Sequence, residues 1–548
     1  MRRLGAVLAL AAFAALTAPG VGSAGRFAVG LDRRADAAGV TAAVERRGGR
    51  VTDDLAQMGA LVVSAPAHAR LQRIRGVRYV EPLTPRRLAL VPMDPFVSRQ
   101  WYLVQSHFYE SWLTYPAFES VPVAVIDSGV DASHPELAGK ILEAKSFVGG
   151  SARVDTLGHG TFVAGLIAAG VDNGIGIAGL APSAQLLVAK VVTPSRTIPV
   201  VAEARAIRWA VDSGARVINM SLGGLRDPLD PDRDSYSQLE ADAVSYAVAH
   251  GVVVVAAVGN DDQAPSSPWR YASYPAALPH VLGVSALAES GSVPEFSNRD
   301  RIYNDISAPG EGILSIFPRP LTSRFPACSE QGFSSCGPDE YREAQGTSFA
   351  APQVTAAAAV LLSLRPTLRP EQTVAILRRS AVDVNADNGC PACATGRDAL
   401  SGWGRLNVAA AIDALSRPLP PRDRYETNDD VGPRAAGLSV RTMRRITATV
   451  DFWDDQDDVY AIGLRKGQPV YVGLTAVDRA ADLSLALWLP QTESIEDVGN
   501  YRMRARLSAR PRGREYLSYR APAAGTYFIQ VRMSAPGATA YRLAIVKG

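Results

Sequence analysis

Three short segments of the chain place a carboxylate, an imidazole and a hydroxyl next to glycines. Asp127 ends an apolar run, His159 lies between two glycines, and Ser348 follows Gly346-Thr347. A serine hydroxyl becomes a good nucleophile when a base removes its proton, and a neutral imidazole is such a base near neutral pH. The imidazole in turn needs a buried carboxylate that fixes its tautomer. Together these residue types predict nucleophilic attack on a carbonyl.

Each of the three residues also has a purely structural interpretation. Taken alone, Asp127 could be a helix cap or a turn residue, His159 could cap a helix, and Ser348 could be the N-cap of the apolar helix that follows it. Their joint occurrence favours chemistry, because the chain order Asp, His, Ser is one of the orders in which a catalytic triad occurs.

The region from 121 to 417 contains the elements that must position these groups. Apolar runs rich in β-branched residues alternate there with helical stretches such as 200–213 and 238–250. This alternation predicts an α/β fold with a parallel sheet and helices on both faces, in which active sites lie at the carboxyl ends of the strands. The apolar runs are Val121–Ile126, Leu186–Val192, Val217–Met220, Val252–Val258 and Val281–Val284.

Different patterns precede and follow this region. Residues 26–82 show the order β-α-β-β-α-β of a ferredoxin-like α+β unit, with its second helix over Ala67–Ile74. Residues 418–422 are a proline-rich linker, and the short alternating segments of 423–548 predict an all-β sandwich.

The first 24 residues have the pattern of a secretory signal peptide. Arg2 and Arg3 precede an apolar run from Leu4 to Leu16, and small residues follow up to Ala24. A membrane anchor is the alternative, but the run is shorter than the ~20 residues that span a bilayer. Export would favour oxidised cysteines. The simplest pairing of the four is Cys328–Cys336 and Cys390–Cys393, with a zinc site as the alternative.

The charge balance limits the class of partner. The formal net charge of +3 argues against a strongly basic nucleic-acid binder. The near-neutral total conceals an uneven distribution, because residues 25–90 carry +6 and residues 91–419 carry −9. We expect this complementarity to help the two regions associate, most strongly at low salt.

Five motifs in order make residues 97–417 resemble the subtilisin-like serine peptidases. They are VAVIDSGVDASHPEL around Asp127, GHGTFVAG around His159, INMSLGG at 218–224, VVAAVGN at 254–260 and GTSFAAP around Ser348. The resemblance implies an endopeptidase that cleaves protein or peptide substrates through an acyl-enzyme. It implies no cofactor for the chemistry. Members of this family often bind structural calcium, but no metal site is identifiable from these motifs.

The resemblance also assigns roles to further residues. Asn260 matches the asparagine that stabilises the oxyanion together with the backbone N–H of Ser348. The segment Ser221, Leu222, Gly223 and Gly224 matches the one that pairs with the substrate as an added strand, where glycines would leave room for the substrate side chain. The far wall of that pocket is expected from Ala256–Gly259 and the stretch before Tyr274. No acidic or basic residue is required at the bottom of this pocket. We therefore expect a broad substrate preference that leans toward apolar side chains.

The flanking regions gain functions by the same resemblance. We expect a signal peptide over 1–24, a self-cleaved inhibitory propeptide over 25–90, a peptidase domain over 91–417, a linker over 418–422 and a C-terminal sandwich over 423–548. At residues 425–429, 458–460 and 524–527 the last of these is similar to the bacterial pre-peptidase C-terminal domain. We expect a secreted monomer without membrane or nucleic-acid partners after signal removal, the cell surface or periplasm being alternative locations.

The sequence departs from the pattern of this family at two places, and two alternative functions remain open. Residues 318–342, with Cys328 and Cys336, form an insertion that is either a stapled loop at the cleft rim or an inert surface loop. The acidic run 454–458 is either a calcium loop or a solvated turn. A catalytically silent binding protein on the same fold is the first alternative function. A lipase or esterase is the second, but it would carry G-x-S-x-G and the order Ser, Asp, His.

Overall fold

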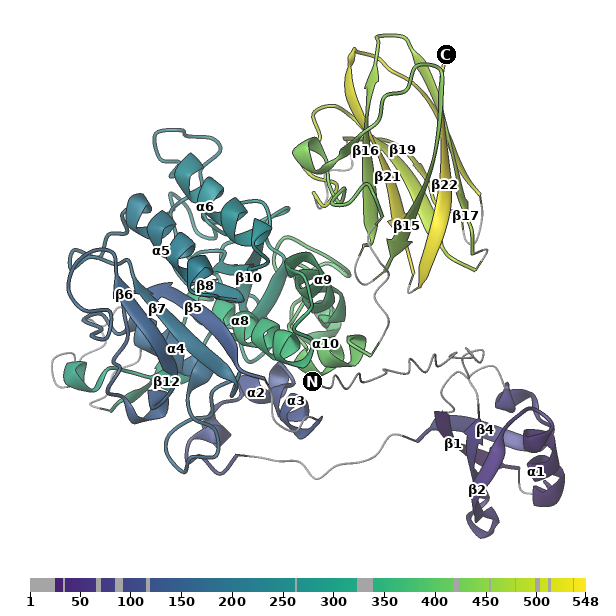
Figure 1. Ribbon diagram of the computed structural model, residues 1–548, viewed down its shortest axis with the longest axis horizontal. Coiled ribbons are helices and arrows are strands. Elements are labelled where there is room, and N and C mark those ends of the chain that lie inside the picture. Colours follow the sequence, from purple (N-terminus) through teal and green to yellow (C-terminus); the bar gives the residue numbers. More distant parts are fainter. Residues whose placement is uncertain are drawn as a thin grey trace, which may run out of the picture. The chain divides into compact units, whose positions relative to one another are not determined.

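The chain divides into two compact units, residues 1–88 and 89–548, which are described separately (Figure 1). The computed structural model describes residues 25–32, 35–65, 70–83, 92–114, 119–261, 264–322, 339–416, 423–452, 455–478, 480–497, 503–510, 514–535 and 537–548. The expected signal peptide, the 418–422 linker, Asp454 of the acidic run and the pair Cys328 and Cys336 lie outside these residues.

The N-terminal unit is a four-stranded antiparallel sheet with order β2-β3-β1-β4 and one packed helix, α1 (Ala37–Glu45). Asp36 caps this helix by accepting the N–H groups of Ala38 and Gly39. The expected α-helix over 67–74 is wrong over its described part, which forms only a 3₁₀ turn, η3 (Leu71–Arg73), because the chain turns after Ile74 to enter β4. The strands are β1 (Gly25–Leu31), β2 (Arg50–Leu55), β3 (Ala60–Ala65) and β4 (Val77–Pro82).

A seven-stranded parallel sheet forms the centre of the second unit, with order β11-β10-β9-β8-β5-β7-β6. The α/β prediction is therefore confirmed, and each of the five apolar runs contributes a strand. The strands are β5 (Val121–Asp127), β6 (Ile141–Ser146), β7 (Ala184–Lys190), β8 (Val217–Met220), β9 (Val253–Ala257), β10 (Val281–Leu287) and β11 (Ile306–Pro309).

Alternation along the strands builds a core on each face of this sheet. Val123 and Val125 pack on one side, whereas Ala124 and Ile126 pack on the other. The first side is covered by α4 (His159–Ala168) and α8 (Thr347–Leu364), with α9 (Pro370–Ser380) and α10 (Val408–Ala414) packed nearby. The other side is covered by α5 (Val200–Asp212) and α6 (Gln238–Ala249), as Figure 1 shows.

Helix α8 runs through the middle of the first core. Among the described residues it is the one helix long and apolar enough to cross a membrane, and 89% of it is buried inside the protein. The burial identifies its apolar surface as core packing, since both Phe349 and Leu361 belong to the same cluster as the central strands.

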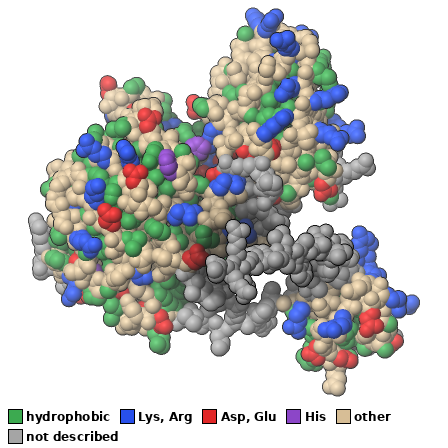
Figure 2. Space-filling model, in the orientation of Figure 1, with side chains coloured by type: hydrophobic (Ala, Val, Ile, Leu, Met, Phe, Trp, Pro, Cys, Tyr) green, Lys and Arg blue, Asp and Glu red, His purple; other side chains and the backbone are tan. Residues whose placement is uncertain are grey.

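The C-terminal region is a sandwich of two sheets, with strand orders β14-β16-β21-β18-β19 and β15-β22-β17-β20. Side chains such as Ile446, Tyr460 and Leu543 fill the space between them. Among the charged side chains on its visible face, basic ones are more prominent than acidic ones (Figure 2). The strands are β14 (Ala436–Gly437), β15 (Met443–Asp451), β16 (Asp457–Leu464), β17 (Pro469–Ala476), β18 (Leu483–Trp488), β19 (Arg504–Ser508), β20 (Glu515–Arg520), β21 (Gly525–Met533) and β22 (Ala538–Lys547).

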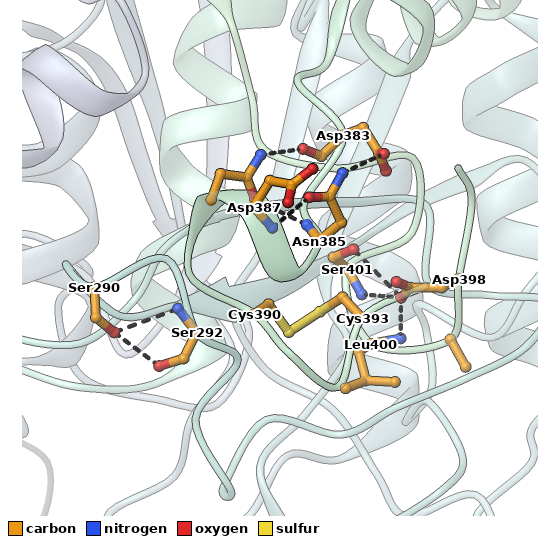
Figure 3. The surroundings of a disulfide bond; sticks show 12 residues. Ser290, Ser292, Asp383, Asn385, Asp387, Cys390, Cys393, Asp398, Leu400 and Ser401 are labelled. Atoms are coloured by element: carbon orange, nitrogen blue, oxygen red, sulfur yellow. Dashed lines mark hydrogen bonds between the residues drawn. A yellow bond between two sulfur atoms is a disulfide. The ribbon is translucent and has the colours of Figure 1, made fainter. Parts of the chain in front are cut away.

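A disulfide joins Cys390 and Cys393 in the loop that follows α9 (Figure 3). Both cysteines are buried against Leu287, the last residue of β10, and against Val384. The bridge therefore fastens this loop to the sheet, and both sulfurs are used in it, which excludes a zinc site made by this pair.

Candidate active site

The parallel sheet and two helices bring the five key residues to one edge. Asp127 is the last residue of β5, Ser221 directly follows β8, and Asn260 comes three residues after β9. His159 is the first residue of α4 and Ser348 the second of α8. Strand ends and helix N-termini therefore meet at this site, and helix dipoles there favour negative charge.

Asp127 and His159 are in direct contact. The Nδ1 atom of His159 lies 2.9 Å from each carboxylate oxygen of Asp127, which is buried and also accepts the N–H of Ser128 at 2.7 Å. The contact requires glycine at 160, because a Cβ there would lie 2.2 Å from the carbonyl oxygen of Gly129. With the Nδ1 proton held by the carboxylate, Nε2 is left to accept a proton.

Asp155 organises the turn that leads into α4, and the sequence motifs did not identify it. Its buried carboxylate accepts the N–H groups of Leu157 and Gly158 at 3.0 and 2.8 Å, and both the N–H and the hydroxyl of Thr161 at 2.9 and 2.7 Å. The Ser128 hydroxyl donates to it at 2.9 Å. An Asp four residues before the histidine, at a turn, is the signal that could have revealed it.

The electrostatics of this group determine the charge of His159. Burial lowers the pKa of His159, but the negative charges of Asp127 and Asp155 and the hydrogen bond that the ring donates to Asp127 outweigh this effect, so the pKa lies above the ordinary 6.5.

We predict that kcat/KM falls as the pH falls through this raised pKa, because the protonated imidazole can no longer act as a base. The midpoint of the acid limb should lie above 6.5. Asp155→Asn removes one of the charges that raise the pKa, so its midpoint should move to lower pH. The pH profile for a chromogenic peptide measures this. Asp212→Asn, which changes an exposed carboxylate on α5, is the control and should leave the midpoint unchanged. An unshifted midpoint in Asp155→Asn would contradict the prediction.

Ser348 lies in the first turn of α8, where it precedes Phe349. Its hydroxyl donates to the backbone carbonyl oxygen of Ser221 at 3.2 Å. The ring of the next residue, Phe349, lies with its centroid 5.5 Å from that of His159 and 4.5 Å from that of Phe162. The aromatic packing joins α8 to α4, so the start of the helix that bears Ser348 lies near His159.

Asn260 has a defined amide orientation. Its Oδ1 accepts the backbone N–H of Thr347 at 3.0 Å and the Thr347 hydroxyl at 3.1 Å. Because donors occupy the oxygen, the Nδ2 group remains available to donate to an oxyanion. Thr347 is a second residue whose part in the site the sequence motifs did not reveal.

Asn260→Ala should lower kcat by about 100–1000-fold with a small change in KM, the range known for the loss of this donor in subtilisin. The donor is needed only when negative charge develops on the carbonyl oxygen. Steady-state kinetics with titrated active sites measure the effect. Asn298→Ala, a buried asparagine whose amide bonds to Val258 and Ser273, is the control; an equal loss of kcat in both variants would show that packing alone matters.

The segment 221–224 forms an antiparallel bridge with Tyr274. The N–H of Gly224 donates to the Tyr274 carbonyl at 2.9 Å, and the Tyr274 N–H donates back at 2.9 Å. A Cβ on Gly223 would lie 2.1 Å from that carbonyl, and one on Gly224 would lie 2.2 Å from the Ser235 hydroxyl. Close packing within the chain therefore requires glycine at both positions, and the expectation that they leave room for a substrate stays a prediction.

The described ends of the insertion lie beside the histidine turn. They continue from a hairpin of β12 (Ile313–Ile316) and β13 (Tyr341–Ala344). Phe317 fills the space beside Gly158, where a Cβ would lie 2.4 Å from its ring, and the Arg342 guanidinium lies 4.0 Å from the centroid of the Phe317 ring. The base of the insertion thus contacts the turn that precedes His159.

A separate acidic cluster in the sandwich has the composition of a cation site. One carboxylate oxygen from each of Glu426, Asp455 and Asp458 lies within 4.8 Å of the others. Asp458 and Asn428 are completely buried, and the Asn428 side chain lies close enough to the Asp458 carboxylate to favour its charged form. Asn428 lies beside this group, because its backbone carbonyl accepts the N–H of Val459.

Comparisons with known proteins agree with this geometry. The Subtilase family matches residues 119–404. Fervidolysin of Fervidobacterium pennivorans is 30% identical over 73% of this chain and 60% of its own length. The cell wall-associated protease of Bacillus subtilis (strain 168) is 27% identical over 77% and 47%, respectively. Subtilisin DY of Bacillus licheniformis is 35% identical over 53% and 90%. The chain thus spans most of the subtilisin but only about half to three-fifths of the first two relatives.

Proposed function

Since the chain belongs to the subtilase family of serine peptidases, we propose that it is an endopeptidase whose catalytic triad is Asp127, His159 and Ser348. The observation that carries the proposal is the pair of 2.9 Å contacts between Asp127 and Nδ1 of His159, made beside the N-terminus of the helix that bears Ser348.

The proposed reaction follows from this arrangement. The Nε2 atom of His159 takes the proton of the Ser348 hydroxyl as the oxygen attacks the substrate carbonyl carbon, and Asp127 stabilises the imidazolium. The Asn260 amide and the Ser348 N–H donate to the resulting oxyanion. The imidazolium then protonates the leaving amine, which yields the acyl-enzyme. Water then attacks the ester carbonyl while His159 takes its proton and passes it to the Ser348 oxygen, so the carboxylic acid product leaves and Ser348 is restored.

Hydrolysis of casein by the purified mature chain tests the proposal. The expected result is the release of new peptide N-termini, because an endopeptidase cuts within its substrate. A chain that binds protein ligands but releases no peptides would instead support the catalytically silent alternative.

We also propose that the chain is made as a secreted precursor. Residues 1–24 act as the signal peptide, 25–90 as an inhibitory propeptide and 423–548 as an appended sandwich. The division into compact units at residue 88 and the charges of +6 and −9 support a separable, complementary prosegment. N-terminal sequencing of the secreted protein tests this, with a mature start expected between Arg87 and Met93. A start before residue 30 would contradict it.

We propose, finally, that the acidic cluster of the sandwich binds one calcium ion through Glu426, Asp455, Asp458 and the Oδ1 of Asn428. All four donors are oxygens, which calcium prefers. Burial raises the pKa of both Glu426 and Asp458. The carboxylates of Glu426 and Asp423 lie near Asp458 and raise its pKa further. A bound cation would offset the repulsion among these negative charges.

Calcium at 100 times its Kd should therefore stabilise the sandwich by about 2.7 kcal/mol, and Asp458→Asn should lose most of this gain. Calorimetry of the Ser348→Ala chain with calcium and with chelator measures it without self-digestion. The exposed Glu493→Gln should keep the full calcium response. An unchanged calcium response in Asp458→Asn would exclude this site.

A further inference from the structure

A row of buried polar side chains connects the nucleophile to the interior of the protein. The Thr355 hydroxyl donates to Oδ1 of Asn219 at 2.8 Å, and Nδ2 of Asn219 donates to the Ser221 hydroxyl oxygen at 2.9 Å. The Ser221 hydroxyl donates in turn to the backbone carbonyl of Ser348 at 2.7 Å. Thr355 and Asn219 are completely buried, and Ser221 is 3% exposed.

This row lies within an otherwise apolar core. Thr355 comes seven residues after Ser348, which is about two helical turns, so both residues lie on one face of α8. Asn219 is two residues after Val217 and therefore points to the same side of the sheet, toward the cluster that contains α8. Buried polar groups are costly unless they are paired. Here each donor and acceptor of the row is paired with the next.

Proline at position 352 explains what the row provides. In an α-helix the carbonyl of Ser348 would accept the N–H of residue 352, but Pro352 lies inside α8 and has no N–H. The Ser221 hydroxyl donates to that carbonyl instead. Ser348 returns the contact, because its own hydroxyl donates to the backbone carbonyl of Ser221 at 3.2 Å.

The direction of each hydrogen bond depends on the one before it. Thr355 donates to Oδ1, which orients the Asn219 amide so that Nδ2 faces Ser221. Since the Ser221 oxygen accepts from Nδ2, its hydrogen points to the Ser348 carbonyl. We infer that Thr355 and Asn219 are positioning residues. They act through Ser221 to fix the position of Ser348 relative to the start of the 221–224 segment.

This inference rests on the proposed function, and the variants separate the two. Thr355→Val keeps the shape of the side chain and removes the hydroxyl, and Thr355→Ser keeps the hydroxyl. We expect Thr355→Val to lower kcat/KM for a chromogenic peptide roughly 10-fold per titrated active site, because even a small misplacement of the nucleophile slows its attack on the substrate. Thr355→Ser should stay within about twofold of the parent.

Two controls distinguish positioning from general stability. Thr373→Val removes another completely buried hydroxyl, which donates to the Arg369 carbonyl on α9, and it should lower Tm without changing kcat/KM. In a Ser221→Ala background, Thr355→Val should have little further effect, because the row is already interrupted. Wild-type kcat/KM in Thr355→Val, or additive effects in the double variant, would overturn the inference. A parent chain without hydrolysis would overturn the proposed function itself.

Discussion

Ser348→Ala is expected to lower the hydrolysis of casein by about 10⁶-fold, the magnitude known for the loss of the nucleophile in subtilisin. The alanine removes the only atom that can form the acyl-enzyme in the proposed mechanism, while the His159–Asp127 contacts and the Asn260 amide remain. If the chain processes itself, the variant should also accumulate as a full-length precursor. Active-site-titrated assays and the size of the secreted chain measure both effects.

The matched control is Ser363→Ala, which lies on the same helix. Ser363 is buried, and its hydroxyl donates to the Val360 carbonyl at 2.7 Å, far along α8 from the site. This variant should retain nearly full activity and mature normally. A Ser348→Ala chain that still matured alone and cleaved casein would disprove the proposed nucleophile.

Asp127→Asn is expected to lower kcat about 10⁴-fold, as in other enzymes with this triad. Both Asp127 oxygens lie 2.9 Å from Nδ1 of His159, so the carboxylate holds the proton on Nδ1. An asparagine amide can present an N–H to Nδ1, which moves the ring proton to Nε2. An Nε2 that carries a proton cannot accept the one from Ser348. Single-turnover kinetics of the purified variant measure the loss.

Asp131→Asn provides the comparison for this carboxylate. Asp131 is also buried near the end of β5, but its oxygens accept from Ser133 and from the N–H of Arg319. We expect it to lower Tm with only a few-fold change in kcat. Equal losses of kcat in the two variants would mean that the region depends on burying any carboxylate, and not on orienting His159.

Much of the fold could be predicted because each central strand is an uninterrupted apolar run. Strands such as Val253–Ala257 are buried on both faces and so carry a strong local signal. The strands β19 and β20 of the sandwich carry a weaker sequence signal because they lie at the edges of their sheets. Edge strands tolerate polar residues, and Arg504–Ser508 contains two arginines, so the pattern is weak.

The site was predictable to the extent that its residues lie in contiguous motifs. Asp127, His159, Asn260 and Ser348 each lie at a strand end or helix start within such a motif. Their supporting residues depend on contacts across the fold: Thr355 is 136 residues from Asn219 in the chain, and Thr347 is 87 from Asn260. Thr355 lies in a run of small apolar residues, so only the folded structure shows its partner.

The Cys390–Cys393 pairing was predictable for the opposite reason, because the two residues are three apart and need no long-range information. The role of the glycines at 223 and 224 required the structure, since the atoms that fill their Cβ positions come from Tyr274 and Ser235. Sequence patterns thus locate reactive groups better than they locate the atoms that hold them.

Labelling with a serine-directed phosphonate, followed by peptide mass spectrometry, tests the central claim most directly. The reagent mimics the tetrahedral intermediate and reacts with an activated serine and not with ordinary hydroxyls. The account predicts one adduct, on Ser348, whose rate of formation falls in Asp127→Asn and which is absent from Ser348→Ala. An active chain that carries the adduct on another residue, or no adduct at all, would contradict it.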